Sequence, residues 1–290
     1  MRRKILIGVL IAAVVGALVT VLVLTQHAPP SVDIMTGSSF VTNIIQDLAD
    51  VKLETRTLIP PGVCPGHYDV KPSEIETLAN SKALFIHNYQ QNYQNIVEAI
   101  EAADNPDLVI TVLNVTGNWM VPAVQAEGVG KIAQALCELY PENAAYYQGN
   151  ATGREQAISA YGDVVKGRLQ DAGIEGVKVI CAEMQAGFVR WAGFDVVATF
   201  GRPEDLTPAQ VADLIDQARG AGVALIIDNL QSGTTTLGAS ISMEQDIAAI
   251  PVTISNFPGG LENTETWEEA IDKNVDLLLT ALNEWEEQYG

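Results

Sequence analysis

Residues 60–74 read Pro-Pro-Gly-Val-Cys-Pro-Gly-His-Tyr-Asp-Val-Lys-Pro-Ser-Glu, and this is the most informative stretch of the chain. It places the thiol of Cys64 and the imidazole of His67 three residues apart in a segment rich in proline and glycine. Thiolate and imidazole are ligands for soft and borderline metal ions. The Pro-Ser-Glu that closes the stretch is typical of a helix start. The stretch therefore predicts a stiff binding loop that leads from a strand into a helix.

On both sides of this loop, apolar strand-like runs alternate with amphipathic helical patterns. In the first half of the chain, strands are predicted at 32–35, 51–58, 83–87 and 108–114, and helices at 40–49, 72–80, 93–102 and 124–139. Such alternation favours an α/β fold in layers with a mainly parallel sheet. We therefore expect residues 31–140 to form one α/β lobe.

A long helical segment is predicted next, at 141–172, where Pro-Glu-Asn provides a good N-terminal signal. The alternation then resumes. Strands are predicted at 177–181, 195–199, 224–228 and 251–254, and helices at 188–192, 207–220, 238–248 and 266–287. This pattern predicts a second α/β lobe at 173–290, with its own mainly parallel sheet flanked by helices, joined to the first lobe by one long linker helix.

The N-terminal end of the chain predicts a membrane segment. Residues 5–24 carry no charge and are long enough to span about 30 Å of hydrocarbon as a helix. Arg2, Arg3 and Lys4 precede them, so the positive-inside rule places the main domain on the extracellular or periplasmic side of the cell membrane. A cleaved signal peptide is the alternative, although neither an Ala-x-Ala site nor a lipobox-type cysteine follows. We expect 1–26 to be a single-pass transmembrane anchor or a signal segment.

Charge and motif content exclude several classes of function. The chain has 16 basic and 36 acidic side chains, a net charge of −20 that repels nucleic acid. Its three cysteines, Cys64, Cys137 and Cys181, cannot close a disulfide framework. The sequence contains no His-Glu-x-x-His, no phosphate-binding loop and no Gly-x-Ser-x-Gly elbow. We therefore expect a protein that is not an enzyme.

The stretch at 60–74 resembles the signature loop of the cluster A-I solute-binding proteins of ABC metal importers, the zinc- and manganese-type proteins, whose pattern reads roughly PPGxDPHxYEPxPSD. Pro60-Pro61-Gly62, Tyr68, Asp69 and Pro72-Ser73-Glu74 fall on this pattern. Residues 141–147 and 266–278 are similar to the family's linker-helix start and closing helix. The resemblance implies two α/β lobes on a long helix, a transition metal ion held between them, and an ABC permease and ATPase as partners.

The resemblance also identifies the four positions where the family has its metal ligands, and in this sequence the residues at those positions differ from the family's. The family's four ligand columns, usually three histidines and a carboxylate, hold Gly66, Gly117, Ala182 and Asn229 in this sequence. Side chains that can bind a metal lie next to these ligand positions in the sequence. We therefore expect a metal site with an altered ligand set, most simply for zinc, with the ligands Cys64, His67, Glu183 and Asp228. Because strands alternate faces, Asp228 points away from Asn229 unless the strand has already ended.

A second set of residues is expected in the cleft around the ion. Its members are Tyr68, His87, Tyr93, Asn118, Trp119, Met184 and Asn229. Aromatic and amide groups of this kind can hold an organic molecule by contact and hydrogen bonding. The alternative to a bare transition-metal ion is therefore a metal chelate or a small organic solute in the same fold. A surface scaffold that has lost metal binding is a further alternative.

Overall fold

The structure, a computed structural model, describes residues 32–233, 237–244 and 246–290. The membrane segment predicted at 1–26 lies outside these residues. Among the helices that the structure does describe, none combines the length and the apolar character that crossing a membrane requires.

The first lobe is built on a parallel four-stranded sheet in the order β2-β1-β3-β4. Its strands are β1 (Ile34–Thr36), β2 (Thr55–Thr57), β3 (Ala83–His87) and β4 (Val109–Leu113). Side chains alternate between the two faces, and both faces are covered. One face packs on α2 (Ser39–Ala49) and α5 (Pro122–Leu139), and the other on α3 (Pro72–Ala79) and α4 (Gln94–Ala103). Burial on both sides explains the uninterrupted apolar run in β3.

The second lobe repeats this topology, with a parallel sheet in the order β6-β5-β7-β8. Its strands are β5 (Lys178–Ala182), β6 (Asp195–Phe200), β7 (Leu225–Asn229) and β8 (Ile250–Ile254). One face packs on α7 (Ala186–Ala192) and α10 (Trp267–Tyr289), and the other on α8 (Pro208–Ala221) and α9 (Leu237–Ser242). The predicted two-lobe α/β fold with parallel sheets is confirmed.

Short 3₁₀ turns follow many of these elements. They are η1 (Asp50–Lys52), η2 (Pro65–His67), η3 (Asn88–Asn92), η4 (Pro141–Asn143), η5 (Glu183–Gln185), η6 (Pro203–Asp205) and η7 (Leu230–Ser232). Two predicted elements are shorter than expected. The strand predicted at 51–58 is only β2, because Asp50 adopts a φ of 54° and η1 occupies the start of that run. The helix predicted at 238–248 ends at Ser242, and Asp246 has a φ of 68° that no α-helix accommodates.

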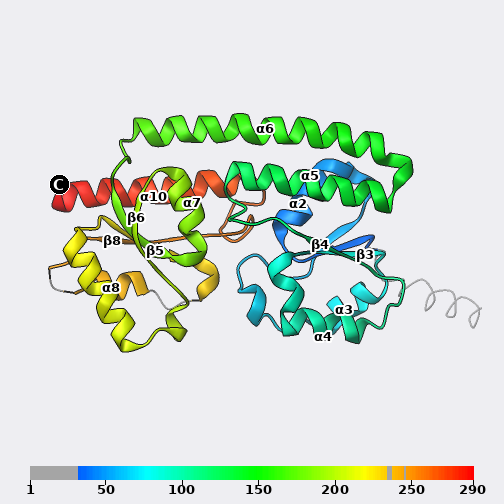
Figure 1. Cartoon of the computed structure of the whole chain (residues 1–290), viewed down its shortest axis with the longest axis horizontal. Helices are drawn as coiled ribbons and strands as arrows, with labels where there is room; N and C mark the ends of the chain where they lie inside the picture. The colour runs from blue at the N-terminus through cyan, green and yellow to red at the C-terminus, as the bar shows by residue number, and fades with distance from the viewer. Residues whose placement is uncertain (1–31, 234–236, 245) are drawn as a thin grey trace, which may run out of the picture.

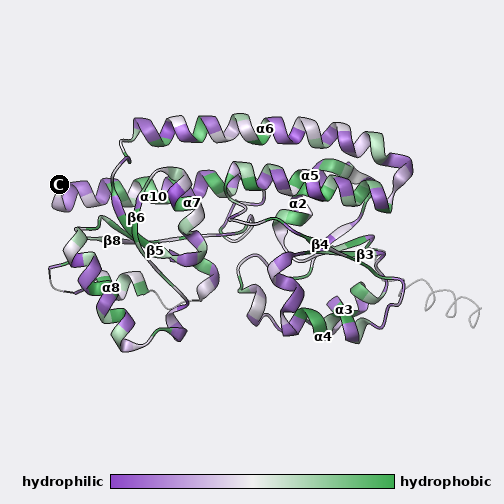
Figure 2. Ribbon diagram, in the orientation of Figure 1, coloured by the Kyte–Doolittle hydropathy of each residue, from purple (hydrophilic) through white to green (hydrophobic). Residues whose placement is uncertain are grey.

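The linker helix α6 (Ala144–Asp171) runs along both lobes, with α5 and α10 beside it (Figure 1). Its 28 residues correspond to about 42 Å at 1.5 Å per residue. Figure 2 shows α6 as mainly hydrophilic with isolated hydrophobic bands. Its buried residues, including Tyr147, Ile158 and Val165, belong to a core cluster that also holds Ile34 of the first lobe and Leu282 of the second. One continuous core therefore joins the linker helix to both lobes.

Arg154 of α6 ties a helix of each lobe to the linker. Its Nε lies 2.8 Å from Oδ2 of Asp47 in α2, and its Nη1 lies 2.5 Å from Oε1 of Glu268 in α10. The Arg154 side chain is only 17% exposed. Burial raises the pKa of Asp47, the Arg154 charge opposes that shift, and the charge of Glu268 adds to it. Without the guanidinium, two half-buried carboxylates would face each other.

The close approach of α5 and α6 gives the first prediction. A Cβ on Gly162 would stand 2.6 Å from Cγ of Pro122, whereas nothing lies within 4 Å of a Cβ on Gly153 or Gly167 of the same helix. Gly162→Ala should force α5 and α6 apart and lower the free energy of unfolding by about 1–3 kcal/mol. Gly153→Ala and Gly167→Ala should raise it by up to about 1 kcal/mol through helix propensity. Urea unfolding measures both, and stabilisation by Gly162→Ala would contradict the contact.

The Arg154 contacts give the second prediction. Arg154→Gln should lower the free energy of unfolding by about 1–3 kcal/mol, because it leaves two partly buried carboxylates without their cation. The matched control is Arg168→Gln on the same helix, whose partners Asp272 and Asp276 are exposed. That change should cost about 0–1 kcal/mol. Equal losses in the two variants, measured by urea unfolding, would refute the role of Arg154.

Candidate functional site

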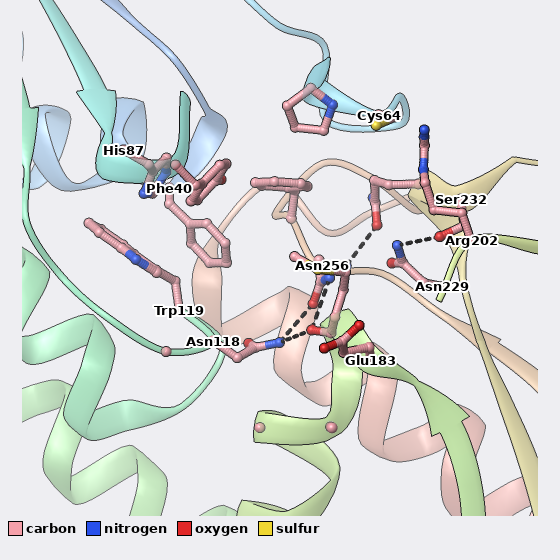
Figure 3. Close-up of a pocket in the computed structure, with 18 of the residues that line it drawn as sticks. Phe40, Cys64, His87, Asn118, Trp119, Glu183, Arg202, Asn229, Ser232 and Asn256 are labelled. Atoms are coloured by element: carbon pink, nitrogen blue, oxygen red, sulfur yellow. Dashed lines mark hydrogen bonds between the residues drawn. The ribbon is translucent and has the colours of Figure 1, made fainter. Parts of the chain in front are cut away.

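A cavity of about 630 Å³ lies between the two lobes (Figure 3). Segments that follow the carboxyl end of every strand contribute to its lining. In strand order from β1 to β8 these residues are Phe40, Cys64, His87, Asn118 and Trp119, Glu183, Arg202, Asn229 and Asn256. In parallel sheets the carboxyl ends of the strands meet at one edge, which is where ligands of α/β proteins bind. The two sheets therefore face each other across the cavity.

One side of the cavity is an aromatic wall, which consists of Phe40, His87, Tyr89, Tyr93, Trp119 and Phe257. The rings contact one another in series. His87 stacks on Tyr89 with ring centroids 5.0 Å apart and meets Trp119 edge-on at 4.4 Å. Phe40 lies 5.9 Å from Trp119 and 5.5 Å from Phe257, which comes from the second lobe. Rings at these separations attract each other and hold the wall rigid.

His87 is a neutral member of this wall. Its Nε2 lies 2.7 Å from the Ser38 hydroxyl, and its side chain is buried. Burial lowers the pKa of His87 to about 3, because a charged imidazolium would lose its hydration. Its backbone N–H donates to Oε1 of Gln90 at 3.0 Å. Nδ1 has no hydrogen-bond partner within the described part of the chain. His87 therefore adds an aromatic face to the cavity and no charge.

The polar part of the lining, called here the amide wall, consists of Asn118, Asn229, Gln231, Ser232 and Asn256. In Figure 3, Asn229 and Ser232 lie across the cavity from Phe40 and Trp119. Buried Gln185 donates to Oδ1 of Asn229 at 2.9 Å, and Nδ2 of Asn229 donates to Ser232 at 3.0 Å. These bonds hold the amide of Asn229 in a fixed orientation.

Several hydrogen bonds cross between the lobes around the cavity. Asn118 of the first lobe donates to Oδ1 of Asn256 at 2.8 Å and to the Met184 carbonyl at 2.8 Å. Gln231 of the second lobe donates to the Pro61 carbonyl at 2.7 Å, which ties down the loop at 60–74. Asn118 thus connects the two lobes by hydrogen bonds. Its place in the sequence, next to the family's ligand position at Gly117, did not predict this role.

Among the residues that the structure describes, the charged groups that line the cavity are Glu183, Arg190 and Arg202. Nη1 of Arg202 contacts His67 of the other lobe, 2.6 Å from its Nδ1, and lies 3.5 Å from a carboxylate oxygen of Glu204. Arg190 and Glu183 have no hydrogen-bond or ion-pair partner among residues 32–233, 237–244 and 246–290. The lining therefore carries two cations and one anion in a chain whose net charge is −20.

The structure brings together only part of the predicted metal-ligand set. Cys64 and Glu183 line the cavity, whereas His67 is exposed beside Arg202 and does not line it. Within the described residues no group of three or more His, Cys, Asp and Glu side chains is placed to hold a metal ion. A site made of Cys64, His67, Glu183 and Asp228 is therefore not assembled in this arrangement.

Asp228 lies outside the cavity, which corrects its predicted placement. β7 continues through Asn229, so the alternation of the strand sends Asp228 to the face covered by α9. There both of its carboxylate oxygens accept the backbone N–H of Gly238, at 3.2 and 3.1 Å. Burial raises the pKa of Asp228 to about 6, and the Gly238 hydrogen bond opposes that rise.

Most of the predicted cleft residues do line the cavity, namely His87, Tyr93, Asn118, Trp119, Met184 and Asn229. Tyr68 does not. Its hydroxyl donates to Oε1 of Glu74 at 2.7 Å, so it braces the start of α3 instead. Sequence reasoning missed Phe40, Arg190, Arg202, Asn256 and Phe257. The rule that ligands bind at strand ends could have found those that closely follow β1, β6 and β8, whereas Arg190 carries no such signal.

Comparison with known proteins places this geometry in context. Residues 34–281 match the family model of ZnuA, described as the periplasmic component A of a zinc-uptake complex. A crystal structure of ZnuA superposes with a TM-score of 0.70 at 16% identity, over 87% of this chain and 99% of that one. A manganese-bound variant of the periplasmic metal-binding protein from Candidatus Liberibacter asiaticus gives a TM-score of 0.70 at 15% identity, over 86% and 98%.

A zinc-bound deletion variant of ZnuA is equally similar, with a TM-score of 0.70 and 16% identity over 87% of this chain and 98% of that one. At such identities the likeness shows the fold. No curated protein is significantly similar to the chain in sequence.

The burial of Asp228 gives the third prediction. Its pKa of about 6 exceeds the ordinary value of 3.8, so the folded state binds the proton more tightly than the unfolded state. Stability should therefore fall as pH rises from about 4 to about 6 and then level off. Asp228→Asn keeps an acceptor for Gly238 and removes the charge, and should raise the free energy of unfolding at pH 7.5 by about 1–3 kcal/mol. In urea unfolding at pH 4 the gain should disappear. A gain of the same size at both pH values would contradict a buried carboxylate.

Proposed function

The chain belongs to the ZnuA family of periplasmic zinc-uptake components, and on this basis we propose that it is the substrate-binding component of an ABC importer for a transition metal. Membership in this family makes it a transport component and not an enzyme. Its substrate would occupy the cavity between the lobes and pass from there to a permease driven by an ATPase.

The observation that carries this proposal is the placement of the cavity. The carboxyl ends of all eight strands open onto it from two sheets of identical order, so both lobes contact any occupant at once. A ligand that touches both lobes stabilises their closed arrangement, and a permease can distinguish that arrangement from an open one. We propose that residues 31–140 and 173–290 form the two ligand-binding lobes and that residues 141–172 form the linker between them.

Zinc is our first candidate for the metal. Cys64 and Glu183 both line the cavity and supply a sulfur and an oxygen that zinc accepts. The thioether of Met184 stands beside Glu183 and would favour softer ions such as Cu(I). These groups come from both lobes, which supports a metal bridging them. His67 and Asp228 do not line the cavity and are not part of the proposed ligand set.

We further propose that the protein acts on the extracytoplasmic side of the membrane, anchored through residues 1–26, with an ABC permease and its ATPase as partners. The acidic surface supports this location. A net charge of −20 keeps an exported binding protein soluble and away from anionic headgroups.

The fourth prediction tests metal transport. The full chain, purified from cells without an affinity metal, should carry about one transition-metal ion per molecule by elemental mass spectrometry, with zinc the most abundant. Cys64→Ser and Glu183→Gln should each reduce the metal content at least twofold, because each removes a cavity ligand. The matched control Cys137→Ser alters a thiol that packs against the carbonyl of Ala144, outside the cavity, and should retain the metal.

The result that would refute the proposal requires that attempts to load the chain with metal fail as well. A chain that retains no metal from cells, and none after equilibration with zinc, manganese or copper(I) salts or their chelates, is not the binding component of a metal importer.

A further inference from the structure

We propose that the occupant of the interlobe cavity is a planar organic anion, an aromatic or conjugated molecule with at least one carboxylate, which brings the metal as a chelate. This inference rests on the function proposed above and names the chemical form of the substrate. The aromatic wall would receive the ring, and Arg190 and Arg202 would receive the carboxylates.

The size of the cavity is the first argument. A zinc ion in a protein site holds its ligand atoms within about 2.3 Å. The cavity here is about 630 Å³, well within the range of roughly 300–1,000 Å³ that holds organic ligands. Aromatic rings and amides make up nearly half of its lining residues, and the described residues do not offer three anionic or imidazole ligands in one place. An ion that arrives with its own ligands needs fewer from the protein.

The sign of the charge is the second argument. A site for a bare dication would be expected to gather carboxylates, and this chain has 36 acidic residues to draw on. The cavity lining has one, Glu183, against the guanidinium groups of Arg190 and Arg202. Arg190 has no hydrogen-bond or ion-pair partner in the part of the chain that the structure describes. Arg190 is exposed to solvent at the cavity, and an accessible guanidinium can bind a carboxylate through two parallel hydrogen bonds.

The arrangement of the walls is the third argument. Phe40, His87 and Trp119 lie on one side of the cavity, and Arg202, Asn229 and Ser232 lie on the other (Figure 3). His87 is only 1% exposed and stacks on Tyr89, so it backs the wall, and Tyr89, which is 39% exposed, offers the ring surface. A planar molecule that stacks on one wall can present its polar edge to the other. The amides of Asn118 and Asn256 complete the polar surroundings below.

Isothermal titration of the full chain tests this inference with a small panel of probes. The panel is pyridine-2,6-dicarboxylate, quinoline-2-carboxylate and phthalate, each alone and with equimolar zinc, together with zinc chloride. Cyclohexane-1,2-dicarboxylate is the matched control for planarity, and dimethyl phthalate is the matched control for charge. We expect at least one planar anion to bind at least tenfold more tightly than zinc chloride, and at least tenfold more tightly than its matched control where one exists.

Variants locate the binding. Arg190→Gln and Arg202→Gln should each weaken the bound anion at least tenfold, and Tyr93→Leu should weaken it through loss of ring contact. The control Arg56→Gln changes an exposed arginine on β2 that does not line the cavity, and should leave the affinity within twofold. Thermal unfolding of each variant without ligand confirms that it folds.

Titrations with and without equimolar zinc distinguish a metal chelate from a free organic acid. Tighter binding with zinc than without it upholds the chelate, whereas equal binding identifies the free organic acid as the ligand and overturns the chelate. Stoichiometric binding of zinc chloride that no panel member improves would overturn the inference while leaving metal import intact. Failure of every planar anion in both arms would overturn it as well.

Discussion

The packing of α6 over a core shared by both lobes is the constraint on which the rest of the structure depends. Gly162 allows α6 to approach the start of α5, and the indole N–H of Trp267 in α10 donates to the carbonyl of Trp119 at 3.0 Å. These contacts fix the lobes side by side along α6 (Figure 1). A rigid helix on a continuous core leaves room for small lobe movements only. Affinity should therefore come from a cavity that is largely formed before the ligand enters.

The repeated topology explains why the site lies where it does. Each sheet runs in the order second, first, third, fourth strand, so each has a switch point between its first and third strands. Because the two sheets face each other, their switch points face each other too. His87 at the end of β3 and Asn229 at the end of β7 occupy equivalent positions in the two lobes, and both line the cavity. One carries an imidazole on the aromatic wall and the other an amide on the opposite wall, so the same architecture gives the two sides different chemistry.

Much of this fold could be predicted from the sequence, because hydrophobic periodicity and proline signals are local. β3 is found where its apolar run predicts it, and α8 (Pro208–Ala221) lies within one residue of the helix predicted at 207–220. Placement in the site depends instead on contacts between distant residues. Phe40 of the first lobe and Phe257 of the second are in ring contact although their sequence neighbourhoods give no sign of it. The phase of β7, which turns Asp228 to the α9 side, depends on where the strand ends, and sequence patterns locate strand ends poorly.

The charge of the cavity and the charge of the surface act over different ranges, and that difference decides what the site favours. Surface carboxylates farther than about 10 Å from the cavity are largely screened at physiological salt. A guanidinium about 6 Å from a dication, at an effective dielectric constant of about 20, opposes it by roughly 5 kcal/mol. Glu183 can offset one of the two arginines, and Glu204, 3.5 Å from Nη1 of Arg202, offsets part of the other. A bare dication in this cavity would therefore gain little net attraction from its nearest charges, whereas an anionic ligand wrapped around the metal would be attracted by both guanidinium groups.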